Sequence, residues 1–146
     1  MKKSLMVTPR LPEAKAAFSR GTKVELDSVI LMFISGTASV DAQGKTAHVG
    51  DFHAQVMHTY KNIVSILERE NAGLKDVVKF TVFLKNMDDY DRFNKARDEF
   101  FEKSGLKREE FPASTCVEAR LCREDLLVEI EAVAIVQKIK FFQGKQ

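Results

Sequence analysis

The distribution of apolar residues predicts three strands in the first two thirds of the chain. Val29 to Ser35 is apolar at almost every position, which is typical of a central strand covered on both faces. Val77 to Leu84 alternates, with Val78, Phe80, Val82 and Leu84 expected on one face and Lys79, Thr81 and Phe83 on the other. Ala16 to Leu26 is a weaker strand candidate, in which Gly21 indicates a bulge or a turn.

Two further segments have the three- and four-residue spacing of apolar side chains that predicts amphipathic helices. The first helix is expected to begin at Gly50-Asp51 and to end at Gly73. Its expected buried side holds Val56, Tyr60, Ile63 and Leu67. The second is capped by residues 86–89 and ends at Gly105. Its expected buried side holds Tyr90, Phe93, Ala96, Arg97, Phe100 and Phe101.

The segment from Phe111 to Ala134 consists of two alternating stretches around the short charged connection Arg123-Glu124-Asp125, which predicts a β-hairpin. One face of this hairpin is expected to hold Ser114, Cys116, Glu118, Glu129 and Glu131. Cross-strand neighbours on one face are close enough to touch. We therefore expect a hydroxyl, a thiol and carboxylates in one patch, with Cys116 opposite or diagonal to Glu129.

The element order predicts a two-layer α+β fold, with both helices packed on one face of a mixed β-sheet. The other face is expected to carry Lys79, Thr81, Phe83, Ser114, Cys116, Glu118 and Glu129. This set is too polar for a core and too apolar for free exposure, so it favours a subunit interface.

Length and composition narrow the class of protein. The 146 residues are 45% hydrophobic and 30% charged, which predicts a single domain over residues 1–146 with one core. The formal charge is only +2 and basic residues alternate with acidic ones, so we expect no nucleic-acid partner. No stretch has the length of a signal-peptide core or a membrane span, and we expect a cytoplasmic protein with no membrane partner. Cys116 and Cys122 are too far apart to pair and are expected to be free thiols.

The three histidines do not predict a metal site. His53 and His58 are five residues apart on the first helix, which separates them by about 140° around its axis. His48 falls in a loop, and the sequence has no Cys-x-x-Cys or His-Glu-x-x-His motif. Solvated or locally hydrogen-bonded histidines are the expected outcome.

Several separated motifs then carry a resemblance to a known family. They are GD-x-x-x-Q at 50–55, N-I-x-x-I-L at 62–67, D-V-V-K-x-T-V-F-L at 76–84, F-N at 93–94 and V-E-I-E-A-V-A at 128–134. In this order, from about Phe18 to Val136, the chain resembles the YjgF/RidA family, also called the L-PSP family.

The resemblance implies a chorismate-mutase-like fold and a barrel-forming homotrimer with clefts between subunits. It also implies hydrolysis of small enamine or imine metabolites, such as 2-aminoacrylate and 2-iminobutanoate, to a 2-keto acid and ammonia. No metal or organic cofactor is implied.

One family motif is incomplete in this chain. The family pattern Pro-Ala-Arg-Ser, whose arginine grips the substrate carboxylate, is Pro112-Ala113-Ser114-Thr115 here. A serine hydroxyl supplies at most one donor, so the loss is expected to cost on the order of a few kcal/mol in carboxylate binding. The family's Tyr-Ser pair is likewise Phe18-Ser19. The chain is thus expected to be a poor deaminase of 2-imino acids unless another cation substitutes.

The remaining family positions define the candidate site. Ser114, Phe18, Gly36 and Asn94 match substrate-binding positions, and Cys116 and Glu129 match the positions that hold and activate the hydrolytic water. The segments 33–39 and 121–131 also resemble the C-terminal half of the chorismatases. That resemblance implies that Glu129 acts as an acid or a base and that Cys122 lies near it.

Several functions stay open on the sequence alone. The family implies a hydrolase or deaminase in which Glu129 activates water, while the missing arginine favours a non-catalytic small-molecule binder or sensor. The chorismatase resemblance favours acid–base chemistry on a cyclic carboxylate. Charge composition gives least support to RNA cleavage or translation inhibition. Glu129 could also be an ordinary interface charge.

Overall fold

The structure is a computed structural model that describes residues 1–138 of the chain. The six strands are β1 (Lys2–Met6), β2 (Gly21–Glu25), β3 (Val29–Ala38), β4 (Val77–Leu84), β5 (Ala113–Glu118) and β6 (Val128–Gln137). The two α-helices are α1 (Phe52–Glu68) and α2 (Tyr90–Lys103). Three short 3-10 turns complete the elements: η1 (Leu74–Asp76), η2 (Met87–Asp89) and η3 (Arg108–Glu110).

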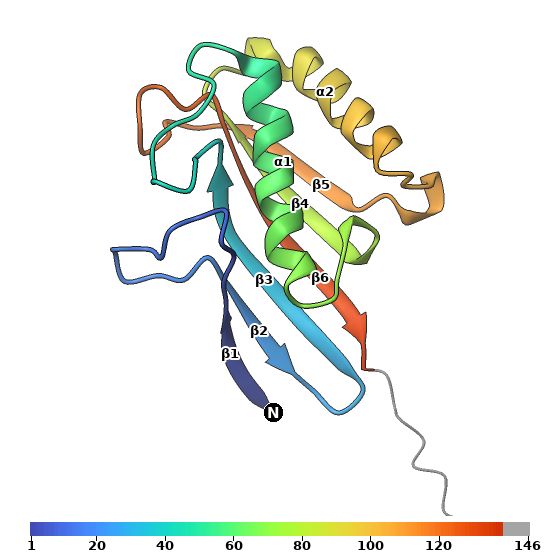
Figure 1. Cartoon of the computed structure of the whole chain (residues 1–146). Helices are drawn as coiled ribbons and strands as arrows, with labels where there is room; N and C mark the ends of the chain where they lie inside the picture. Colours follow the sequence, from blue (N-terminus) through green and yellow to red (C-terminus); the bar gives the residue numbers. More distant parts are fainter. Residues whose placement is uncertain (139–146) are drawn as a thin grey trace, which may run out of the picture.

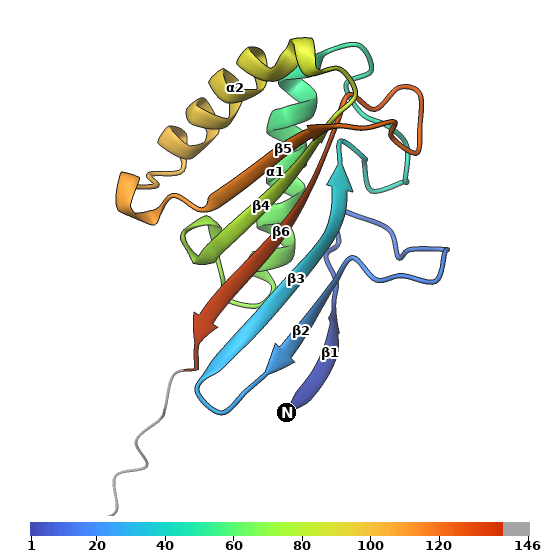
Figure 2. The ribbon, with the colours of Figure 1, turned by 180° about the vertical axis from the view of Figure 1, so that it is seen from behind.

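The strands form one mixed sheet in the order β1-β2-β3-β6-β4-β5. Every neighbouring pair is antiparallel except β4 and β5, which run parallel. Both helices cover the same face of this sheet, and no helix of residues 1–138 lies on the other face (Figures 1 and 2). The predicted α+β arrangement of two layers is therefore confirmed.

The helix α1 forms where the sequence predicts it, because its N-cap residue and its stripe of apolar side chains both lie at the expected positions. Asp51 is the N-cap, and its side chain accepts a hydrogen bond from the Ala54 backbone N–H. All four apolar residues expected on its inner side are fully buried. The ring of Tyr60 stacks on Phe100 of α2, with centroids 5.1 Å apart, and packs edge-on against Phe80 of β4 at 5.5 Å. This aromatic cluster joins the two helices to the sheet.

Two buried polar side chains of α1 hold the loops at one end of the sheet. Asn62 donates hydrogen bonds to the carbonyls of Ala38 and Val40, each at 3.0 Å. Gln55 donates to the Asp125 carbonyl at 2.8 Å and accepts from the Leu127 backbone N–H at 2.9 Å. Both side chains are fully buried. The helix thereby fixes the chain after β3 and the connection before β6 relative to each other.

The predicted hairpin of residues 111–134 is wrong. The strands β5 and β6 are not neighbours, because β4 lies between them and pairs with both. Alternation determines which residues share a face, but it does not determine which strand is the partner. The helix α2 connects β4 to β5 as a crossover, and a crossover delivers a parallel strand beside the one it left.

The corrected pairing moves part of the predicted patch to the other face of the sheet. Val82 of β4 lies between Cys116 and Ile130, and Ile130 is fully buried under the helices. Cys116 also packs against the hydrophobic core. Because side chains alternate, Ser114, Cys116 and Glu118 belong to the helix-covered face, while Glu129 and Glu131 belong to the open face. The predicted contact of Cys116 with Glu129 is therefore wrong within one chain.

Three smaller differences have local causes. The strand β1 was not predicted, because only five residues, two of them lysines, pair with β2 at the sheet edge. Val78 was expected in the core but is 44% exposed, since a bulge interrupts the pairing of β4 with β6 between Val77 and Lys79. Tyr90 was expected to be buried but is also 44% exposed, at the first turn of α2.

The substitution Asn62→Ala tests the role of the buried amide. It removes the side-chain donor of two carbonyls, of which Ala38 keeps the Val40 backbone N–H, and we expect the free energy of unfolding to fall by about 1–3 kcal/mol. Urea unfolding followed by circular dichroism measures this loss. Lys61→Ala, at an exposed neighbouring position of the same helix, serves as the control and should change stability by less than about 0.5 kcal/mol. Equal stability of the two variants would contradict the assigned role.

Candidate functional site

A cavity of about 770 Å³ lies where the end of β3 meets the loops 12–20 and 122–126. Its lining includes Phe18, Arg20, Gly36, Cys122, Arg123 and Glu129, together with the carboxylate residues Glu13 and Glu131. We call it the Glu129 cavity. Four of these residues, Phe18, Gly36, Cys122 and Glu129, are sequence-predicted site residues, and the fold brings them together from distant parts of the chain.

The place of the Glu129 carboxylate depends on the absence of a side chain at Gly36. A Cβ atom added to Gly36 would lie 2.1 Å from Oε1 of Glu129 and 2.9 Å from its Cδ, far inside contact distance. The bulge in β3 between Ile34 and Thr37 places Gly36 against this carboxylate. Glycine is therefore needed here for close approach.

The electrostatics of Glu129 suit a proton-transfer group. Burial raises the pKa of its carboxyl, and the negative charge of Glu131 raises it further. In the part of the chain that the structure describes, no hydrogen bond or ion pair holds the carboxylate in its charged form. A carboxyl whose pKa is raised toward neutrality can both give and take a proton at physiological pH.

The other predicted residues lie on the opposite side of the sheet. Ser114 lines a separate pocket of about 210 Å³, together with Arg97, Tyr60 and Phe111. Burial raises the pKa of the nearby Cys116 thiol, and the charge of Arg97 opposes this shift. In this chain burial thus favours the neutral thiol of Cys116 over the thiolate.

Asn94 lies one turn before Arg97 on α2. Its side-chain oxygen is buried and has no hydrogen-bond partner among residues 1–138. An unpaired buried oxygen is costly, so a donor from outside the described chain would satisfy it.

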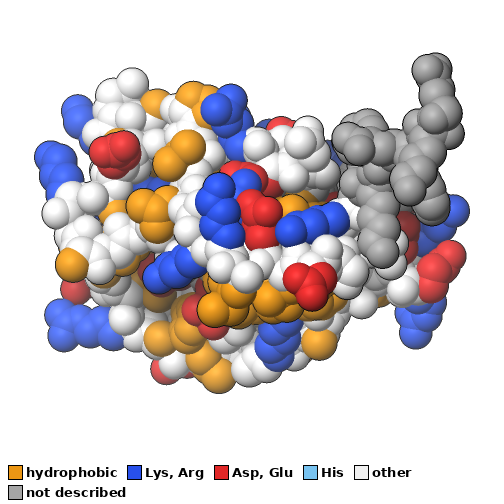
Figure 3. Space-filling view, turned by 90° about the horizontal axis from the view of Figure 1, so that it is seen from below, with side chains coloured by type: hydrophobic (Ala, Val, Ile, Leu, Met, Phe, Trp, Pro, Cys, Tyr) orange, Lys and Arg blue, Asp and Glu red, His pale blue; other side chains and the backbone are white. Residues whose placement is uncertain are grey.

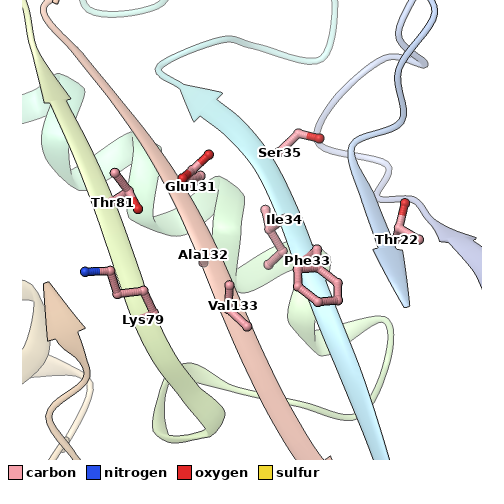
Figure 4. A pocket seen from close by; sticks show the side chains of 9 residues that line it. All are labelled: Thr22, Phe33, Ile34, Ser35, Lys79, Thr81, Glu131, Ala132 and Val133. Atoms are coloured by element: carbon pink, nitrogen blue, oxygen red, sulfur yellow. The ribbon is translucent and has the colours of Figure 1, made fainter. Parts of the chain in front are cut away.

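The open face of the sheet carries a mixture of groups. A pocket of about 270 Å³ lies across β2, β3, β6 and β4, with Lys79 and Thr81 on one side and Phe33 and Ser35 on the other (Figure 4). Lys79, Thr81, Phe83 and Glu129 are on this face as predicted, whereas Ser114, Cys116 and Glu118 are not. Large apolar side chains are also exposed here: Leu5, Phe33, Val117 and Ile135. The combination is typical of a surface that is covered in an assembly.

Sequence reasoning missed the arginines of the Glu129 cavity and the buried amides of α1. Arg20 lies just before β2 and Arg123 lies in the connection to β6. Both are loop residues outside any periodic pattern, so no sequence signal distinguished them from solvated charges. Gln55 and Asn62 could have been found, since both belong to the family-like motifs and lie on the buried side of a predicted helix.

The histidines and thiols have ordinary local environments. His53 pairs with Glu99 at 2.7 Å, and His58 shares a hydrogen bond with Ser39 at 3.0 Å. Over residues 1–138 no three His, Cys, Asp or Glu side chains are grouped as metal ligands. Cys116 and Cys122 are free thiols, as predicted. In the same residues no helix has the length and hydrophobicity to cross a membrane.

Comparison with known proteins places the chain in a family. The model of the Endoribonuclease L-PSP family matches residues 8–136. The 3-aminoacrylate deaminase RutC of Acinetobacter baylyi is 33% identical over 93% of this chain and 100% of its own length. The 2-iminobutanoate/2-iminopropanoate deaminase of Salmonella typhimurium is 33% identical over 89% of this chain and 95% of its own.

A solved structure of E. coli TdcF with bound serine has a similar fold. It superposes with a TM-score of 0.76 at 27% identity, over 91% of this chain and 98% of that one. The motifs, the observed fold and these relatives agree over nearly the whole length of the chain. The chain therefore belongs to the L-PSP family, the YjgF/RidA family of the sequence analysis.

Proposed function

We propose that this protein hydrolyses small enamines or imines, with the Glu129 carboxyl as the acid–base group and water as the nucleophile. The observation that carries the proposal is the half-buried Glu129 carboxyl, which is seated against Gly36 in a cavity of about 770 Å³ and has a raised pKa. Two deaminases of such compounds are among its relatives at 33% identity.

The proposed reaction needs one group that first gives a proton and then takes one. Protonated Glu129 gives its proton to the enamine carbon or the imine nitrogen, which leaves an electrophilic iminium carbon. Water adds to that carbon and returns a proton to the carboxylate. Glu129 gives this proton to the nitrogen, and the carbon–nitrogen bond breaks as the new hydroxyl becomes a carbonyl and returns its proton to Glu129, so that ammonia leaves with a ketone or aldehyde as the other product. The net change is the exchange of C=NH for C=O with one water consumed.

A homotrimer would complete this site. The candidates Ser114, Cys116 and Asn94 lie across the sheet from Glu129 within one chain, so they would have to come from a neighbouring copy. The exposed apolar side chains of the open face, Leu5, Phe33, Val117 and Ile135, support an assembly through that face. Light scattering at micromolar concentration should give the mass of a trimer of the 16.5 kDa chain. A monomer would contradict this part of the proposal.

A second candidate function is acid–base chemistry on a cyclic carboxylate. Cys122 and Glu129 line one cavity, as the chorismatase resemblance expects, and about 770 Å³ is ample for a six-membered ring. A panel of imines generated in situ and a panel of cyclic enol ethers, both followed for product formation, distinguish the two functions. The panel in which wild-type protein accelerates the reaction identifies the chemistry.

The family description also names endoribonucleases. Basic and acidic side chains are interspersed on the end of the molecule seen in Figure 3, without a continuous basic surface. Phosphate backbones bind surfaces on which basic side chains cluster, so this view gives no support to an RNA substrate. Incubation with RNA in a nuclease-free preparation should leave the RNA intact.

The substitution Glu129→Gln should abolish most of the activity. An amide can neither give nor take the proton, and we expect kcat to fall about 100-fold or more with a small change in KM. The assay follows formation of the 2-keto acid from an imine generated by an amino-acid oxidase. Glu109→Gln, an exposed position on η3, is the matched control and should retain full activity. Unchanged turnover of Glu129→Gln would refute the role of Glu129.

The substitution Glu131→Gln should shift the pH profile. The Glu131 charge raises the pKa of Glu129, so its removal lowers that pKa. Because protonated Glu129 starts the reaction, activity is lost as pH rises through this pKa, and the loss should occur at lower pH in the variant. The measurement is kcat/KM against pH for both proteins. A shift toward higher pH, or none, would show that another group controls the profile.

The substitution Gly36→Ala should displace the carboxylate without unfolding the protein. The atoms it meets are the flexible end of the Glu129 side chain, so the carboxyl moves and the backbone stays. We expect kcat to fall about as far as in Glu129→Gln, with little change in the unfolding midpoint. Gly73→Ala is the control, since nothing lies within 4 Å of a Cβ there. Full activity of Gly36→Ala would mean that the carboxylate position is unimportant.

A further inference from the structure

The Glu129 cavity contains two arginines that stand close to each other. Arg20 and Arg123 both line it, although more than one hundred residues separate them in sequence. Burial lowers the pKa of Arg20, and the positive charge of Arg123 lowers it further. Two cations that repel each other are destabilising unless something negative lies between or beside them.

Each arginine is held in place by neutral groups. Arg20 donates through Nε to the Pro12 carbonyl at 3.0 Å, and its guanidinium lies 5.7 Å from the centroid of the Phe18 ring. Arg123 donates through Nη1 to the Gly44 carbonyl at 2.9 Å and more weakly to the Thr46 hydroxyl at 3.4 Å. These contacts orient the guanidinium groups but do not neutralise them.

No carboxylate among residues 1–138 forms an ion pair with either guanidinium, although Glu13, Glu129 and Glu131 also line the cavity. All ion pairs found within residues 1–138 involve other cations. Arg97, which shares a pocket with Ser114, is occupied by two hydrogen bonds to Asp98 at 2.8 and 3.0 Å. Lys15 also lines the Glu129 cavity, but it is exposed and is held by no ion pair in this part of the chain. Arg20 and Arg123 are the oriented cations of the cavity, and their unused N–H groups match the geometry of a carboxylate.

We propose that Arg20 and Arg123 bind the carboxylate of the substrate, and so supply the positive charge that the strand position Ser114 no longer offers. This inference rests on the proposed function, because it names the substrate class of the same cavity. The substrate is then a carboxylic acid whose anionic end lies at the two arginines and whose reacting carbon lies toward Glu129. An uncharged enamine or imine would be a poor substrate.

Binding of a stable product analogue tests the inference without any turnover. The probes are 2-oxobutanoate and its uncharged methyl ester, with affinities measured by calorimetry or NMR titration on the wild-type protein. We expect the carboxylate to bind, and Arg20→Gln and Arg123→Gln each to weaken it about tenfold or more, while the ester is unaffected. Arg108→Gln, an exposed position on η3, is the control for the loss of a positive charge.

A different carboxylate site, or no carboxylate site, would give different binding results. Weakening by Arg97→Gln but not by Arg20→Gln or Arg123→Gln would assign the carboxylate to the Ser114 pocket and overturn the inference. Absence of binding to wild-type protein, or wild-type affinity in both arginine variants, would overturn it as well. Arg123 is exposed, so its substitution keeps the test valid if Arg20→Gln fails to fold. Carboxylate binding through both arginines without hydrolysis of any imine would retain this inference and refute only the proposed function.

Discussion

The central position of β6 is the constraint on which the rest of the structure depends. This strand pairs with β3 on one side and β4 on the other, so its residues have no freedom to change face. Val128, Ile130, Ala132 and Ala134 are all buried under the helices. The intervening Glu129 is thereby forced onto the open face, at the end of the sheet where Gly36 leaves room for it. A half-buried carboxyl thus follows from the hydrophobic pattern of its own strand.

The faces of the elements could be predicted from the sequence, but the order of the strands could not. The cap at Asp51, the buried stripe of α1 and the alternation in β4 from Lys79 to Leu84 each depend on residues close in sequence, and the structure confirms them. The partner of β5 depends on where α2 delivers it, which is a property of the whole fold. Because the predicted hairpin was wrong, Cys116 was assigned to the wrong face of the sheet. The assignment of Glu129 to the open face is confirmed.

The candidate site was predictable to a similar extent. Phe18, Gly36, Cys122 and Glu129 come from four separate segments, and only the family resemblance related them before the structure brought them into one cavity. The resemblance assigned no role to Arg20 or Arg123. Their significance depends on two loops meeting in space and on the absence of a described counter-charge, and neither property is encoded in a local pattern.

The two sets of candidate residues differ in how firmly the sheet holds them. Glu129 lies on a strand that is hydrogen-bonded along both sides, whereas Ser114 lies on β5, an edge strand bonded to β4 alone. Edge strands open more readily and tolerate more changes than central ones, because fewer bonds must break. The residue at position 114 can therefore change at little cost to the fold, while Glu129 stays anchored by the bonds on both sides of its strand. A sheet built in this way allows the edge position to vary independently of the central one.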